Sequence, residues 1–129
     1  MDSLILPSTC NTPAVTFLPD GNLTISGRAI SAKAWRFFEP LFDWVNEYRE
    51  NPAQDTTLNL EFEILHVDSL VKIMDICRLL AQLNKKGFNV SVNWYCEQGD
   101  DDMRDMAAMV SELLKSVTIN EVMIEKDMT

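Results

Sequence analysis

The stretch Thr57–Lys72, TLNLEFEILHVDSLVK, contains the change from strand to helix that decides the fold. Its first half places apolar residues at every second position, and these are Leu58, Leu60, Phe62 and Ile64. Such a period of two is typical of a strand with one buried and one polar face. From Leu70 onward the apolar residues recur at the spacing of a helix. The stretch therefore predicts a strand that runs directly into a helix.

The junction between these two elements reads His66-Val67-Asp68-Ser69. Asp68 and Ser69 are both good helix N-caps, because their side-chain oxygens can accept an unpaired N–H of the first turn. The helix dipole also stabilises a carboxylate or a phosphate at this position. Two interpretations follow: the junction is a helix cap and nothing more, or it also displays a charged regulatory group to a partner.

The same two periods recur along the rest of the chain. The expected strands cover residues 14–18, 22–26 and 88–96, with a further short one over residues 121–124, and the other expected helices cover residues 32–49 and 101–115. Each clear strand alternates between apolar and polar residues, so one face of the sheet is expected to stay uncovered. The sequence predicts a two-layer α/β fold, an open-faced mixed sheet of four to five strands with three helices on one face.

The domain organisation follows from the length and from the ends of the chain. A chain of 129 residues suits a single domain, and no linker divides it. Residues 1–13 contain two prolines and are expected to form an extended N-terminal arm. Residues 116–129 are expected to form a C-terminal tail or a short edge strand.

The predicted helix over residues 32–49 is unusually aromatic. Its apolar residues cover about half of the helix circumference, more than the stripe of roughly 100° that packing on a sheet requires. Trp35 and Trp44 lie at the two margins of this arc. The surplus has two explanations, a wide core contact or a surface for a partner. In the second case, the expected partner-binding residues are Trp35, Phe37, Trp44, Tyr48 and the nearby His66.

Charge and composition narrow the possible partners. Acidic residues outnumber basic ones 20 to 11, which gives a formal net charge of −9. Such a surface repels phosphate backbones, so nucleic acid is not expected as a partner, whereas a basic patch on another protein is. No apolar run approaches the ~20 residues of a membrane span, and no signal peptide is evident. The three cysteines lack metal-ligand spacing and fit a reducing cytoplasm.

Few residues are suited to catalysis. His66 is the single histidine, and no cysteine next to it in the sequence suggests a nucleophile pair. Glycine-rich phosphate-binding motifs are missing, and the acidic residues 100–105 do not match a calcium loop. The sequence predicts neither an enzyme nor a bound cofactor or metal. Two other functions stay open: sensing of a small molecule or nucleotide near His66, and a minor enzymatic role for His66 with Glu63.

Several segments taken together resemble the SiaC family of bacterial regulatory phosphoproteins. The likeness spans residues 6–114 and rests on LPSTCNTPAV (6–15), ISGRAI (25–30), FFEPLFDWVNEY (37–48), NPAQDTTLNLEFEIL (51–65), MDIC (74–77) and LNKKGFNVSVNWYCE (83–97). It implies a fold similar to the STAS domains of anti-sigma-factor antagonists, and no catalytic activity. An anti-sigma-factor-antagonist-like partner switch is therefore a related alternative.

The resemblance also implies a mode of action. In this family a partner-switch kinase phosphorylates a threonine, and a PP2C-like phosphatase removes the phosphate. The unphosphorylated form binds and activates a diguanylate cyclase, which raises cyclic di-GMP and favours biofilm formation. The expectation for this chain is a cytoplasmic, non-catalytic switch protein with these three partners.

The junction departs from the family pattern, which usually reads Asn-Thr-Ser-Ser. Val67 stands at the position of the phosphorylated threonine and has no hydroxyl group. Asp68 and Ser69 follow it, and three interpretations result. The switch is lost, or Asp68 supplies a permanent partial charge, or Ser69 has become the acceptor. A carboxylate carries about one charge against about −1.5 to −2 for a phosphate, so any mimicry is incomplete.

Overall fold

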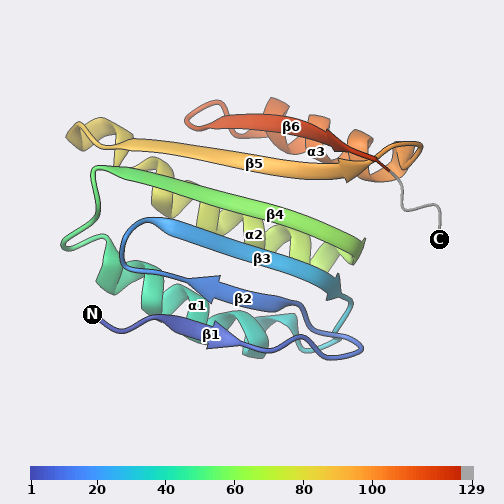
Figure 1. Cartoon of the computed structure of the whole chain (residues 1–129), viewed down its shortest axis with the longest axis horizontal. Helices are drawn as coiled ribbons and strands as arrows, with labels where there is room; N and C mark the ends of the chain where they lie inside the picture. Colours follow the sequence, from blue (N-terminus) through green and yellow to red (C-terminus); the bar gives the residue numbers. More distant parts are fainter. Residues whose placement is uncertain (126–129) are drawn as a thin grey trace.

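This computed structural model, which describes residues 1–125, contains a single six-stranded mixed sheet with the first and last strands of the chain at its opposite edges (Figure 1). The strands are β1 (Leu4–Leu6), β2 (Ala14–Phe17), β3 (Asn22–Ala29), β4 (Asp55–Leu65), β5 (Asn89–Glu97) and β6 (Thr118–Ile124). Their order in the sheet is the same as their order in the chain. β1, β2 and β3 pair antiparallel, whereas β3 to β6 are parallel neighbours.

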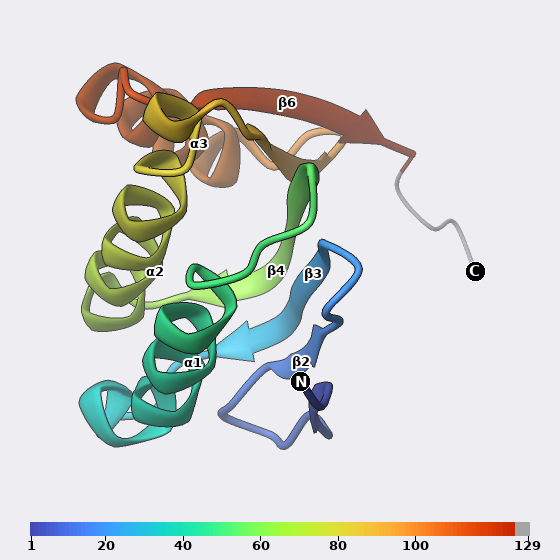
Figure 2. The same ribbon diagram turned by 90° about the vertical axis from the view of Figure 1, so that its left-hand side faces the viewer.

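Three helices connect the parallel strands. They are α1 (Ala34–Tyr48), α2 (Val67–Ala81) and α3 (Asp101–Leu113), and a short 3-10 helix, η1 (Asn84–Lys86), follows α2. Figure 2 shows all three α-helices on one side of the sheet, with the other side uncovered. The prediction of a two-layer, open-faced α/β fold is confirmed. Among the described helices, none is both long and apolar enough to cross a membrane.

The strand alternation separates a core from a polar face. The side chains of Leu58, Leu60 and Phe62 are buried beneath the helices. On the opposite face, Asn59, Asn93 and Asn120 occupy one row across β4, β5 and β6. Their side-chain amides are linked by hydrogen bonds of 3.2 and 3.1 Å. These contacts pair some of the polar side-chain groups on this face with one another, and such a polar face is expected for a surface left open to water.

The predicted number of four to five strands is wrong by at least one, because the predicted extended arm contains β1. This strand has three residues, too few for an alternating pattern to be recognised. It pairs with β2 at the edge of the sheet. At the other end, the predicted edge strand is present as β6 and is longer than expected. The last part of the predicted tail, residues 126–129, lies outside the described residues.

The predicted alternation also fails at the end of β4. Ile64 was expected on the buried face, yet 42% of its surface is exposed, and Leu65 is buried instead. The reason is a β-bulge: Gly27 pairs with Phe62, while the next residue of β3, Arg28, pairs with Ile64. The extra residue in β4 turns the following side chains to opposite faces.

Two of the predicted partner-binding aromatics belong to the core. Trp44 stacks on Tyr48, with ring centroids 5.1 Å apart, and both side chains are buried. The indole N–H of Trp44 donates a hydrogen bond of 2.9 Å to the backbone carbonyl of Asp2. The expectation that these two residues offer an exposed surface is therefore wrong, because the first strands of the sheet cover that margin of α1.

We expect the variant Tyr48→Phe to lower the free energy of unfolding by about 1–3 kcal/mol. The Tyr48 hydroxyl lies 2.6 Å from the Thr56 hydroxyl and accepts a hydrogen bond of 3.2 Å from the Ala53 N–H. Its removal leaves buried polar groups without partners. Urea unfolding measures the change, and Tyr95→Phe is the matched control, because its 3.5 Å contact with Asn59 lies on the open face. An equal loss of stability in both variants would contradict the view that the buried hydrogen bonds of the Tyr48 hydroxyl stabilise the fold.

Candidate functional site

The site lies at the carboxyl ends of the parallel strands, where the helices begin. β3, β4 and β5 run parallel, so their carboxyl ends lie at the same edge. The helices that follow these strands, α1, α2 and α3, all start there. This geometry brings Trp35, in the first turn of α1, close to the start of α2. Open α/β sheets commonly bind ligands or partners outside this edge.

The helix α2 begins at Val67, directly after β4. His66 is its N-cap, and the His66 Nδ1 accepts a hydrogen bond of 3.4 Å from the N–H of Asp68. The prediction that Asp68 or Ser69 caps the helix is therefore wrong by two or three residues. The strand continues up to Leu65 and leaves His66 as the single residue between the elements. Asp68 instead lies in the first turn, where the helix dipole stabilises its charge.

The residues of the junction differ sharply in their accessibility. Val67 and Asp68 point to solvent, and 59% of the Val67 surface is exposed. Ser69, in contrast, is 2% exposed, because it lies on the side of α2 that packs into the fold. A kinase cannot reach the Ser69 hydroxyl unless this first turn opens. The burial of Ser69 in the folded chain therefore argues against the interpretation in which Ser69 has become the phosphate acceptor.

A shallow hollow lies between α1 and α2 beside this junction. It has a volume of about 230 Å³ and is lined by Ala32, Ala34, Trp35, Asp68, Val71 and Lys72. Trp35 is 63% exposed and Val71 is 49% exposed. We refer to Trp35, Val67 and Val71 together with this hollow as the α1–α2 patch. Exposed apolar groups that lie close together are typical of interaction sites, which makes this patch the candidate site.

The structure brings together some of the predicted site residues and separates others. Trp35 and Asp68 line the same hollow, whereas His66 and Val67 are not among its lining residues. Val67 lies one helical turn before Val71, which does line it. Phe37 is half-buried against Phe38, with ring centroids 5.1 Å apart, and contributes to the core. Sequence reasoning missed Val71, although its spacing of four residues from Val67 places both on one helix face.

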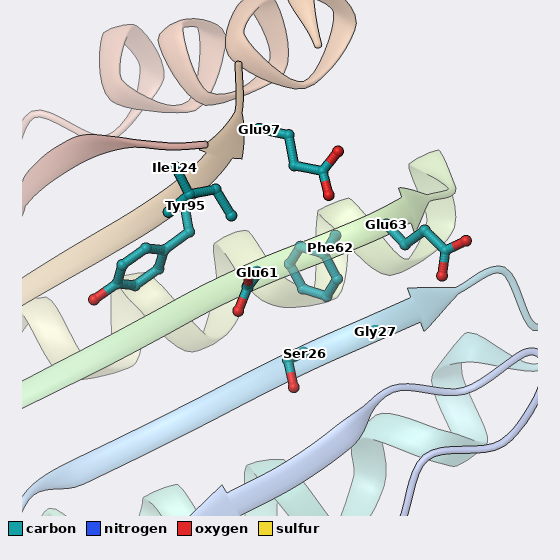
Figure 3. A pocket seen from close by; sticks show the side chains of 8 residues that line it. All are labelled: Ser26, Gly27, Glu61, Phe62, Glu63, Tyr95, Glu97 and Ile124. Atoms are coloured by element: carbon teal, nitrogen blue, oxygen red, sulfur yellow. The ribbon is translucent and has the colours of Figure 1, made fainter. Parts of the chain in front are cut away.

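A second hollow lies on the open face of the sheet and has a volume of about 270 Å³ (Figure 3). Its lining includes Glu61, Glu63 and Glu97, together with the Tyr95 ring. Figure 3 shows these carboxylates spread over β4 and β5 without converging on a common point. Within residues 1–125, no group of three or more His, Cys, Asp or Glu side chains is arranged to hold a metal ion. This hollow therefore lacks the geometry of a metal centre.

The two buried thiols, those of Cys77 and Cys96, lack the surroundings of reactive cysteines. Burial raises the pKa of Cys77 to about 12. Burial, followed by the negative charge of Glu121, raises the pKa of Cys96. Both side chains are therefore neutral thiols at physiological pH, and a neutral thiol is a poor nucleophile. At the carboxyl ends of the strands, the chain displays exposed apolar side chains beside the carboxylate of Asp68.

A family model and a protein of related sequence both match most of this chain. A family model described as "SiaC family regulatory phosphoprotein" matches residues 6–124. An uncharacterised protein of Pseudomonas aeruginosa (strain UCBPP-PA14) is 26% identical over 108 residues, which cover 83% of this chain and 86% of that protein.

Two solved structures have the same fold. The crystal structure of apo-SiaC from Pseudomonas aeruginosa is similar with a TM-score of 0.80 and 24% identity, covering 95% of this chain and 98% of that one. A crystal structure of the diguanylate cyclase SiaD in complex with its activator SiaC, also from P. aeruginosa, matches with a TM-score of 0.82 and 23% identity. That match covers 95% of this chain and 99% of the other.

Proposed function

This chain belongs to the SiaC family of regulatory phosphoproteins, and we propose that it binds and activates a diguanylate cyclase through the α1–α2 patch without turning over a substrate itself. The observation that carries the proposal is the exposure of Trp35, Val67 and Val71 beside the strand-to-helix junction. Aromatic side chains at the centre of an interface contribute most of its binding energy. The complex of a similar protein with the cyclase SiaD supports the choice of partner.

We also propose that the junction at residues 67–69 is not regulated by phosphorylation in this chain. Control by a partner-switch kinase and a PP2C-like phosphatase requires an accessible hydroxyl group at the start of α2. In this chain Val67 has none, and the Ser69 hydroxyl is buried. We therefore propose that phosphorylation does not act at residues 67–69 and that the patch stays competent for binding. The carboxylate of Asp68 is then a permanent feature of the interface rather than a switched one.

We expect the purified chain to raise the rate of cyclic di-GMP synthesis by the diguanylate cyclase encoded in the same organism. The measurement is a titration of the chain into the full-length cyclase with GTP, followed by chromatographic analysis of the product. Stimulation should saturate at the stoichiometry found by calorimetry. Failure to bind and stimulate any cyclase of that organism would refute the proposal, and a thermal shift with a nucleotide or metabolite would then favour a sensing domain.

A further inference from the structure

Among residues 1–125, no lysine or arginine pairs with the carboxylate of Asp68, which lies at the rim of the hollow between α1 and α2. Two arginine–carboxylate ion pairs form among residues 1–125, and Asp68 takes part in neither. The His66 Nδ1 lies 3.8 Å from the Asp68 carboxylate, but it accepts a hydrogen bond from the Asp68 N–H and so does not act as a cation. In contrast, Asp75 and Glu121 each contact an arginine at 2.9 Å. The side chain of Asp68 is 63% exposed, so water now solvates its charge.

Lys72 lines the same hollow but does not pair with Asp68. Its Nζ atom lies 6.0 Å from the centroid of the Phe42 ring, in a cation–π arrangement on the flank of α1. The spacing from Asp68 to Lys72 is four residues, which on a helix permits an ion pair. Because Lys72 is oriented toward Phe42 instead, the Asp68 carboxylate remains available to a group from outside the chain.

We propose that the partner segment docked in this hollow carries a large apolar side chain beside an arginine or lysine, and that this cation pairs with Asp68. The inference rests on the proposed function and defines which segment of the cyclase is recognised. The hollow has room for one large apolar side chain, with Trp35 and Val71 as its walls. Docking brings the partner next to the Asp68 carboxylate at the rim of the hollow, where a cation is attracted and a second negative charge is repelled.

The overall charge of the chain favours the same kind of partner. Its net charge of −9 attracts a basic segment from a distance and repels a second copy of the chain. A charge pair at the rim of an interface mainly increases the rate of association and the dependence on salt. Binding through Asp68 should therefore weaken as the ionic strength rises.

The test compares Asp68→Asn with the native chain in binding to the full-length cyclase, at about 50 mM and about 500 mM NaCl, where screening lengths differ severalfold. At low salt we expect Asp68→Asn to weaken binding about tenfold, mostly through a slower association rate. At high salt the two proteins should bind almost equally. Asp68→Glu, which keeps the charge, should remain close to the native affinity at both salt concentrations.

Controls separate this inference from the proposed function. Glu112→Gln removes one negative charge from the exposed surface of α3, near the opposite end of the fold, and should leave binding unchanged. Equal effects of salt on the native chain and Asp68→Asn would overturn the inference, even if Trp35→Ala still abolishes binding and supports the proposed function. No binding by the native chain would refute both. Self-association that Trp35→Ala abolishes would assign the hollow to a second copy and overturn the inference.

Discussion

Replacing Trp35 with alanine is expected to weaken binding to the diguanylate cyclase by at least about 30-fold, which corresponds to about 2 kcal/mol. The Trp35 side chain forms one wall of the hollow between α1 and α2 and is 63% exposed in the free chain. A partner that docks there removes most of this ring from water. Isothermal titration calorimetry measures the affinity, and the cyclic di-GMP assay should show a matching loss of stimulation at a fixed concentration.

The stability of the fold should be unaffected by this substitution, because an exposed side chain contributes little to the core. We expect the free energy of unfolding to change by no more than about 0.5 kcal/mol. Leu113→Ala is the matched control: Leu113 is 60% exposed, but it lies at the far end of α3. A comparable loss of affinity in Leu113→Ala, or none in Trp35→Ala, would show that the partner binds elsewhere.

Replacing Ser69 with glutamate should destabilise the fold by about 3 kcal/mol or more, which lowers the melting temperature by about 10 °C. Ser69 lies in the first turn of α2 and faces the interior. A carboxylate at this position has to be buried or has to force the turn away from the sheet. A phosphate at Ser69 carries more charge and meets the same obstacle. Thermal unfolding followed by circular dichroism measures the effect.

Val67→Glu is the control for this prediction, since it introduces the same side chain two residues earlier. Val67 is exposed, and the helix dipole stabilises a negative charge in the first turn. We expect Val67→Glu to leave the melting temperature within about 2 °C of the native value, because surface substitutions change stability little. If Ser69→Glu proved as stable as Val67→Glu, the first turn of α2 would open readily, and Ser69 would return as a candidate phosphate acceptor.

The two tryptophans of α1 show a limit of what helical spacing can predict. Trp35 and Trp44 lie at opposite margins of one broad apolar arc, and nothing in the sequence of the helix distinguishes them. In the folded chain Trp44 contacts Phe17 of β2, with ring centroids 5.3 Å apart, and donates a hydrogen bond to Asp2. Within the part of the chain that the structure describes, no element covers Trp35 in the same way, and its side chain is 63% exposed. The distinction depends on residues far away in the sequence, which a helical pattern does not include.

At the strand-to-helix junction, too, the local sequence determined the approximate position of the helix start, and the tertiary structure determined the details. The change of period within residues 57–72 was enough to place a helix start close to Asp68, and the resemblance to the SiaC family directed attention to the same residues. Neither could show that the helix begins at Val67 with His66 as its cap. The bulge that exposes Ile64 arises from the pairing of β4 with β3, so no pattern within β4 alone predicts it.

By itself, the sequence determined the two-layer α/β architecture and the acidic charge, because alternation, helical spacing and charge are properties of neighbouring residues. The family was indicated by the resemblance of whole segments, and a family model matches residues 6–124. The tertiary structure decided which aromatic residues reach the surface and which junction residues a partner can touch. The accessibility of a side chain depends on what packs against it, and in this fold the β1–β2 edge covers Trp44 while the inward side of α2 hides Ser69. Trp35, Val67 and Asp68 remain exposed for a partner.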